Sequence, residues 1–426
     1  MEDNFKFINQ KMKLILTVGQ ILLENGATAD RIIRNSQRVA ACMNIPAENF
    51  NMQVMPSILF LNISDGEKSY TEFRNCPKHA INMDIVTAVS RFTRNELTEN
   101  FSLNKIRDSL EKITAKKKIY SLPETIFATG AACGGFCFLF GGDIFAVFYT
   151  MLCAMLGKTL QLKLLKTGVN AFFVIAISAF TATVAAYYAH FLPSNTEWRP
   201  ITACALFLIP GVPMINATVD ILNKFLSNGM NSALRAMFVS IPMSAGIVLA
   251  AELFVAINPL AIIEINNLDF TLKLLPEHNI FTFAIAAAIA SIGFSVLFNV
   301  PKKLFLAVGI LGAVAVCTKF FFILELGFAA EWGTLSGATL AGFLAIKARQ
   351  LTNTPMQVLI IPAMIPLVPG VLIYRFLFAC ITVEYLPADE FFEAVKLGID
   401  ATQIIFAISI GAVLPILLGD KFFEKK

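Results

Sequence analysis

The chain has 426 residues, 56% hydrophobic and 15% charged, with a mean hydropathy of +0.68. Soluble domains carry about 25% charged residues, so the composition excludes an ordinary soluble enzyme, as well as a collagen, a disordered chain and a disulfide scaffold. The charge is unevenly spread, because residues 1–120 hold 30 of the 64 charged side chains and residues 121–426 hold the other 34. We therefore predict a soluble front domain followed by a membrane domain.

The first 120 residues predict a small α+β domain. Apolar residues at helical spacing predict helices, and Asn25-Gly26 ends the first of them. Two β-rich runs on either side of the turn signal Ser64-Asp65-Gly66 predict a hairpin. The expected order is a helix at 5–24, a helix through Ile32 and Val39, a hairpin of 53–63 with 70–73, and helices at about 80–97 and 102–117. The acidic, polar start, without an apolar leader, predicts that this domain stays in the cytosol.

Ten apolar segments of about 17–25 residues follow, the length that crosses ~30 Å of hydrocarbon. They lie at about 123–141, 144–161, 168–190, 201–222, 233–257, 279–298, 303–322, 332–349, 356–379 and 395–418. With a cytosolic front domain, twelve Lys and Arg of the loops and tail fall on the cytosolic side and three on the other, where acidic residues dominate. This asymmetry follows the positive-inside rule and predicts that both termini are cytosolic.

Internal similarity predicts that the membrane domain is a duplication. Residues 135–140 recur as 293–298 and residues 208–212 recur as 367–371, at offsets of 158 and 159 residues, and 229–241 more weakly resembles 398–410. Each unit has five spans, an odd number, so the second must cross the membrane in the opposite sense. The predicted fold is therefore an all-α polytopic membrane domain of about ten transmembrane helices, arranged as two inverted five-helix repeats, with an N-terminal cytosolic α+β domain. Its expected parts are 1–120, the first repeat 121–258, an extracytoplasmic linker 259–278 and the second repeat 279–426.

A Pro-Gly pair lies near the middle of two equivalent spans, Pro210-Gly211 in the first repeat and Pro369-Gly370 in the second. Proline removes a helix hydrogen bond, and glycine lets the backbone be approached closely. One such pair alone is more often a kink in a packed helix. Two pairs at equivalent positions of inverted halves favour a binding site near the membrane midplane.

Five ionisable residues lie inside the predicted spans, where a charge costs several kcal/mol and is a functional candidate by default. They are Asp220, Glu252, Lys319, Arg375 and Asp400. Asp220 lies one helical turn after Asn216 on the same face, so its carboxyl group could bind and release a proton. Arg375, next to Tyr374 and at the repeat position of Asn216, could pair with a substrate carboxylate. Glu252 and Asp400 are further candidates for proton coupling. The alternative is that Asp220, Lys319, Arg375 and Asp400 extend from span ends to the surface, and that Glu252 faces the acidic outer side.

Other chemistries lack their motifs. Gly157-Lys158-Thr159 resembles the end of a Walker A motif, but the earlier glycine of that motif is missing, so ATP drive is not supported. The three histidines form no His-Glu-x-x-His motif, so a metalloprotease has no zinc ligands. Basic clusters such as 116–118 suit membrane topology better than nucleic acid. We expect no metal, no cofactor and no nucleic-acid partner.

Three stretches resemble the threonine/serine exporter family. They are residues 22–27 (Leu-Leu-Glu-Asn-Gly-Ala) followed by Asp30-Arg31, the stretch Pro210-Gly211-x-Pro213-x-x-Asn216-x-x-x-Asp220, and Pro369-Gly370. The resemblance covers nearly the whole chain and implies proton-motive-force-driven efflux of small hydroxy amino acids or dicarboxylates across a bacterial inner membrane. In some members the two five-span units are separate proteins, similar to a paired succinate exporter, whereas here they are fused.

The expected function is secondary export of threonine, serine or a dicarboxylate such as succinate by proton antiport through the lipid bilayer, without enzymatic activity. The expected substrate-binding residues are Pro210, Gly211, Pro213, Asn216, Pro369, Gly370, Tyr374 and Arg375, and the proton-coupling residues are Asp220, Asp400 and Glu252. The front motif of Asn25, Gly26, Ala27, Asp30 and Arg31 is either functional or only a helix-helix turn with a surface ion pair. The alternatives are a membrane-anchored enzyme or sensor whose front domain is active, and a passive channel. Whether the chain forms a homo-oligomer stays open.

Overall fold

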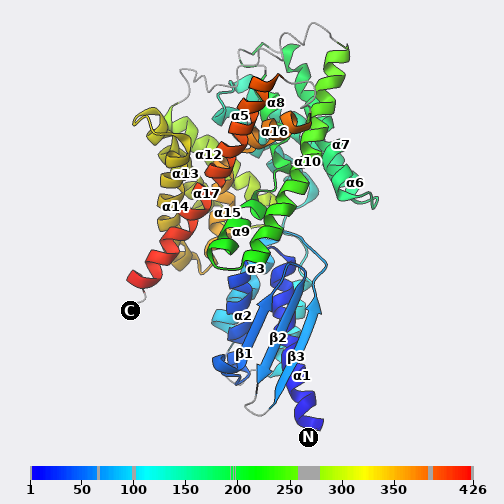
Figure 1. Cartoon of the computed structure of the whole chain (residues 1–426), viewed down its shortest axis with the longest axis vertical. Coiled ribbons are helices and arrows are strands. Elements are labelled where there is room, and N and C mark those ends of the chain that lie inside the picture. The colour runs from blue at the N-terminus through cyan, green and yellow to red at the C-terminus, as the bar shows by residue number, and fades with distance from the viewer. Residues whose placement is uncertain are drawn as a thin grey trace.

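The structure is a computed structural model that describes residues 2–64, 68–97, 102–191, 193–194, 196, 198–257, 279–381 and 387–423. Figure 1 shows its two parts: a domain with three adjacent strands lies below a larger group of helices, and the lower ends of α9 and α10 reach this domain. The turn residues 65–66 and the predicted linker 259–278 lie outside the described residues.

The N-terminal domain packs its helices against one antiparallel sheet. Its elements are α1 (Glu2–Glu24), α2 (Ala29–Cys42), η1 (Ala47–Asn49), β1 (Phe50–Val54), β2 (Ile58–Ser64), β3 (Ser69–Asn75), α3 (Met83–Arg91), the π-helical turn η2 (Phe92–Glu96) and α4 (Leu103–Thr114). The strands are in the order β1-β2-β3, with Leu61 opposite both Met52 and Glu72. Buried Ile15 and Leu22 of α1 and Leu59 and Leu61 of β2 belong to its core.

The predicted hairpin is wrong in one respect, because its first run forms two strands. Met55-Pro56-Ser57 interrupts the run 53–63, and the Met55 N–H donates to the Ile58 carbonyl at 2.9 Å to close a turn. Proline cannot donate to a strand ladder, so Pro56 ends β1. The result is a three-stranded meander, and its third strand is the predicted 70–73 segment, extended to Ser69–Asn75.

The remaining helices repeat one order of elements. The first series is α5 (Leu122–Leu139), α6 (Ile144–Leu165), α7 (Ala171–Tyr187), η3 (Tyr188–Phe191), α8 (Arg199–Ala203), η4 (Leu206–Leu208), α9 (Gly211–Leu222) and α10 (Leu226–Ile257). The second is α12 (Ile280–Leu297), η5 (Lys302–Leu304), α13 (Phe305–Leu324), α14 (Ala330–Thr352), α15 (Met356–Met364), η6 (Ile365–Leu367), α16 (Gly370–Ile381) and α17 (Ala388–Phe423).

Within the described residues, six helices are long and apolar enough to cross a membrane, or up to eight spans if each of two bent helix pairs counts as one. Two of the ten predicted spans are not among them. The segment 168–190 contains α7, an apolar helix of 17 residues, and the segment 332–349 forms α14, which carries charged residues such as Lys347 and Arg349 toward its C-terminal end. The fold is thus mostly helical, with six to eight candidate membrane spans.

The helices α5 and α12 cross at Gly135 and Gly293, which the internal sequence similarity predicts to be equivalent. A Cβ added to Gly135 would lie 2.8 Å from the Ala286 carbonyl oxygen, and a Cβ added to Gly293 would lie 2.7 Å from that of Ala128. Residues 128 and 286 differ by the same 158 positions as 135 and 293. At this crossing, the rings of Phe136 and Phe294 meet edge to face with centroids 5.9 Å apart. The two helices therefore exchange equivalent contacts.

Both predicted Pro-Gly interruptions are confirmed. The chain bends by 62° between Arg199–Leu208 and α9, and by 63° between Met356–Leu367 and α16. The backbone is the same at both bends: the Gly211 N–H donates to the Ile209 carbonyl at 2.8 Å, and the Gly370 N–H donates to the Val368 carbonyl at 2.9 Å. These tight i to i−2 bonds replace the helix bonds that a proline interrupts.

Candidate functional site

The two interrupted helices pack against each other through their glycines. A Cβ at Gly211 would collide with Cδ1 of Ile365, and a Cβ at Gly370 would collide with Cδ1 of Ile209 and lie 3.1 Å from Leu206 Cδ2. Positions 206 and 365 are separated by 159 residues, as are 211 and 370. The structure thus brings the predicted pairs Pro210-Gly211 and Pro369-Gly370 together, each beside the turn that precedes the other.

The polar face of α9 binds the turn between α1 and α2. The Ala29 N–H donates to Oδ1 of Asp220 at 3.0 Å, and Nδ2 of Asn216 donates to the Gly26 carbonyl at 3.2 Å. Gly26 has a φ of +88°, a left-handed conformation that favours glycine and turns its carbonyl toward α9. The two motifs that lie about 190 residues apart in the sequence therefore form one contact.

Gln357 of α15 extends this contact to the second half of the membrane helices. Its Nε2 donates to the Gly26 carbonyl at 3.1 Å and to Oδ1 of Asn216 at 3.2 Å. A single backbone carbonyl of the N-terminal domain thus accepts from α9 and from α15. Neutral hydrogen bonds of this kind contribute about 1 kcal/mol each, and leaving such a buried group without its partner costs more.

A cavity of about 160 Å³ lies between the N-terminal domain, α9 and α10. Pro213, Asn216 and Asp220 line its α9 side, which begins just after the break at Gly211. The α10 side carries Asn228, Asn231, Ser232 and Arg235, and the N-terminal domain contributes the turn at Gly26 and His79. Partial burial, followed by the charge of Arg235, lowers the pKa of His79, which favours the neutral ring near pH 7. The cavity therefore places one carboxyl group and one guanidinium group among uncharged hydrogen-bonding groups.

A second contact joins the N-terminal domain to the turn after α12. The Met83 and Asp84 N–H groups, at the start of α3, donate to the carbonyls of Phe298 and Asn299 at 2.9 and 3.0 Å. The Asn299 side chain donates to Oδ1 of Asn82 at 2.7 Å and accepts from the Ile119 N–H at 2.9 Å. Asn299 has a φ of 55°, which Asn tolerates better than most residues. The amino end of α3 thus lies head to tail on the carboxyl end of α12, an arrangement that pairs opposite helix dipole ends.

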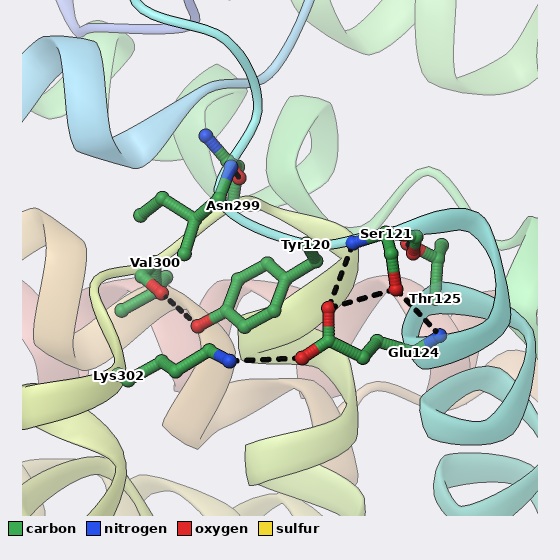
Figure 2. Close-up of polar contacts among 8 residues, drawn as sticks. Tyr120, Ser121, Glu124, Thr125, Asn299, Val300 and Lys302 are labelled. Atoms are coloured by element: carbon green, nitrogen blue, oxygen red, sulfur yellow. Dashed lines mark hydrogen bonds and ion pairs between the residues drawn. The ribbon is translucent and has the colours of Figure 1, made fainter.

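The segment that leads into α5 is attached at the same place (Figure 2). The Tyr120 hydroxyl donates to the Val300 carbonyl, and Lys302 Nζ lies 2.8 Å from Oε1 of Glu124. The other carboxylate oxygen of Glu124 accepts from the N–H and hydroxyl of Ser121 at 2.8 and 2.9 Å, which completes a capping box at the start of α5. Burial raises the pKa of Tyr120, so its hydroxyl stays a donor. The lysine-glutamate pair is exposed and contributes little.

The predicted site residues fall into two groups. The cavity beside α9 collects Pro213, Asn216 and Asp220, whereas Arg375 on α16 is partly buried and is not among the residues that line it. Glu252 is exposed on α10, and Asp400 is partly exposed on α17. The Tyr374 side chain lies outside the described residues. The functional roles assigned to all of these residues, including Asn216 and Asp220, stay predictions.

The front motif is a turn, and it is also a docking element. Asn25 Nδ2 donates to the Ile21 carbonyl at 2.7 Å, and Gly26 and Ala29 contact α9 as described above. Asp30 pairs with Arg34 on the exposed surface of α2, while Arg31 lines a different cavity. The sequence does not predict Gln357, Asn228 and Arg235 as site residues. Their only signal is polarity at the ends of apolar segments, which does not distinguish a site from a surface loop.

These features define a multi-pass membrane protein whose small N-terminal domain is bound to two interrupted helices. Residues 13–254 match the family model ThrE, a threonine/serine exporter model, and residues 283–418 match the model ThrE_2, "Threonine/Serine exporter, ThrE". The chain therefore belongs to the threonine/serine exporter family. It is also 24% identical, over 246 residues, to the Escherichia coli (strain K12) protein named "Probable succinate transporter subunit YjjP", an alignment that covers 57% of this chain and 94% of that protein. No solved structure matches the chain.

Proposed function

We propose that the protein is a secondary active exporter of a small carboxylate-bearing metabolite, namely threonine, serine or a dicarboxylate such as succinate, driven by proton antiport. The observation that carries the proposal is the cavity beside α9, in which Asp220 and Arg235 lie among amide and hydroxyl groups. Arginine binds carboxylates in a bidentate geometry, and a partly enclosed carboxyl group can take up and release a proton. Family membership supports transport rather than an enzymatic reaction.

In this proposal the cavity is the cytosolic approach to the breaks. It extends from Pro213, two residues after Gly211, to Asp220 and the N-terminal domain. The excess of basic loop residues on the side of this domain supports a cytosolic position for it and for both termini. Family membership supports a bacterial inner membrane as the location.

The proposed architecture is two inverted repeats of five spans each, residues 121–258 and 279–426. Three observations support it: the repeated element order, the equal bends of 62° and 63°, and the exchanged contacts at Gly135 and Gly293. Gly135 contacts Ala286, and Gly293 contacts Ala128, so each copy uses the same two sequence positions toward the other. Such reciprocal contacts are expected when two copies face each other across a two-fold axis. With five spans per copy, that axis lies in the membrane plane. Substrate and proton then bind where the halves meet.

Counterflow into proteoliposomes tests the proposal. Purified full-length protein is reconstituted with unlabelled threonine, serine or succinate inside, and uptake of the labelled compound is followed. We expect exchange for at least one of the three, and net efflux that stops when the proton gradient is collapsed. Transport that ignores the gradient would instead indicate a channel. Absence of exchange for all three, together with a wider panel of small acids, would contradict the proposal.

A further inference from the structure

A second cavity, of about 40 Å³, lies between the N-terminal domain and the turn from α14 to α15, and arginines dominate its lining. Six of the residues that line it are arginines: Arg31, Arg34, Arg38, Arg91, Arg94 and Arg349. Among the described residues that line it, none is Asp or Glu. The Asp30 carboxylate is next to it but already pairs with Arg34. The cavity therefore carries a large excess of positive charge.

The arginines come from four elements that meet at this point. Arg31, Arg34 and Arg38 follow the spacing i, i+3, i+7 and share one face of α2. Arg91 ends α3 and Arg94 lies in the π-helical turn η2 that continues it. Arg349 lies in the last turn of α14, which the left-handed Asn353 ends. The N-terminal domain and the second half of the membrane helices thus both contribute positive charge to one cavity.

This arrangement is unfavourable for the protein alone. Burial, followed by the charges of Arg34 and Arg349, lowers the pKa of Arg31 to about 9, and burial, followed by the charge of Arg94, lowers the pKa of Arg38. Nε of Arg31 and the hydroxyl of Ser90 are buried without a hydrogen-bond partner in the described structure. Buried polar atoms are nearly always paired, so two unpaired donors beside clustered cations indicate an anionic ligand.

We propose that this cavity binds a phosphate group, which joins the N-terminal domain to the α14–α15 turn. A phosphate carries up to two negative charges and offers several acceptor oxygens, which guanidinium groups bind in bidentate pairs. A carboxylate has only two acceptor oxygens, so it would pair with fewer of the guanidinium groups. A cavity of 40 Å³ exceeds the ~10–15 Å³ that one water needs and suits a compact group rather than a large organic ligand. The phosphate belongs either to an anionic lipid headgroup or to a soluble phosphate compound.

Binding to the delipidated full-length protein in neutral detergent tests this proposal and separates the two sources. Inorganic pyrophosphate is titrated by calorimetry, with sodium chloride at equal ionic strength as reference, and phosphatidylglycerol is compared with phosphatidylcholine by native mass spectrometry. Saturable binding of pyrophosphate identifies a soluble phosphate ligand, and selective retention of phosphatidylglycerol identifies a lipid. If neither probe binds in preference to its reference, the proposal is overturned.

Variants test whether the probes bind in this cavity. The double variant Arg38→Gln/Arg94→Gln should weaken the effective probe by at least tenfold, whereas Arg107→Gln/Lys112→Gln, which removes two exposed charges of α4, should leave its affinity unchanged. Without probe, Arg38→Gln/Arg94→Gln should melt no lower than the wild type, because it removes repulsion. Arg38→Lys/Arg94→Lys, which keeps the charge but loses the bidentate geometry, should bind with intermediate affinity. Equal weakening in both double Gln variants would assign the binding to general surface charge and overturn the proposal.

Discussion

The helices α9 and α16 begin at similar bends but carry different side chains. Both begin with the Gly of a Pro-Gly pair after a bend of about 60°, and both replace a helix bond with the same tight turn. At equivalent positions, however, α9 carries Asn216 and Asp220 where α16 carries Arg375 and buried Ala379. The two halves thus share the bend, whereas the polar pair Asn216 and Asp220 belongs to α9 alone. A shared scaffold does not imply shared function at each copy.

The strongest test of this asymmetry is Asp220→Asn. The amide keeps an oxygen that accepts from the Ala29 N–H, so the fold should persist, but it cannot exchange a proton. We expect transport driven by a pH gradient to fall to background in proteoliposomes while substrate counterflow continues. Asp108→Asn, on the exposed surface of α4, is the matched control. Unchanged pH-driven transport would remove Asp220 from the coupling mechanism.

A second comparison asks which half holds the substrate carboxylate. Arg235 lines the cavity beside α9, and Arg375 occupies the equivalent of Asn216 on α16. Loss of a charged hydrogen bond costs about 1.5–3 kcal/mol, so Arg→Ala at the residue that binds substrate should raise the half-saturating concentration roughly tenfold or more. Initial transport rates over a series of substrate concentrations give the half-saturating concentration of each variant, with Arg107→Ala as control. If neither variant changes it, the carboxylate is recognised elsewhere.

The proposed duplication can be tested through the crossing of α5 and α12. Gly135→Ala and Gly293→Ala each place a Cβ less than 3 Å from a backbone carbonyl oxygen of the other helix, which must move away. We expect each to destabilise the protein by about 1–3 kcal/mol, and by similar amounts because the contacts are equivalent. Gly309→Ala, whose Cβ meets only flexible side-chain atoms of Ile292 and the more distant Ala288 Cβ, should cost less. Melting temperatures in one detergent give the comparison, and unequal effects of the first two would argue against equivalent packing.

The smallest expected effects concern the contact at Asn299. Asn299→Ala loses two side-chain hydrogen bonds and strains a left-handed backbone, so the free energy of unfolding should fall by about 2 kcal/mol. Asn299→Gly keeps the backbone conformation and loses only the hydrogen bonds, so the free energy of unfolding should fall by less. Lys302→Ala removes the exposed pair with Glu124 and should change stability by under about 1 kcal/mol. Chemical unfolding in one detergent measures all three, and an Asn299→Ala variant as stable as Lys302→Ala would show that the Asn299 side-chain hydrogen bonds do not stabilise the fold.

The sequence predicts the scaffold better than the site. Hydropathy and the two Pro-Gly pairs locate the helices and both bends, because segment length and proline chemistry act locally. The count of spans is predicted less well, since α7 is short and α14 carries charge at one end. The hairpin became a meander because Pro56 interrupts a run whose β propensity continues on both sides.

The site depends on docking, which local patterns do not encode. Asp220 and Asn216 could be selected as polar groups in an apolar span, but their partner is the Gly26 turn, about 190 residues away. Gln357 lies at the start of the predicted span 356–379, and its role is seen only because it donates to Asn216 of α9. The six arginines are also far apart in the sequence, because α2, α3, η2 and α14 contribute one to three each. The sequence pattern therefore does not group them into one site.

The N-terminal domain is attached to both halves of the membrane helices at once. It holds Asp220 and Asn216 of the first half, and Gln357 and Asn299 of the second. Because the N-terminal domain is hydrogen-bonded to both halves, it cannot stay bound to both if they move apart. Relative motion of the halves therefore requires one set of these bonds to break. At about 1 kcal/mol for each bond, these contacts favour the arrangement of the two halves that the structure shows.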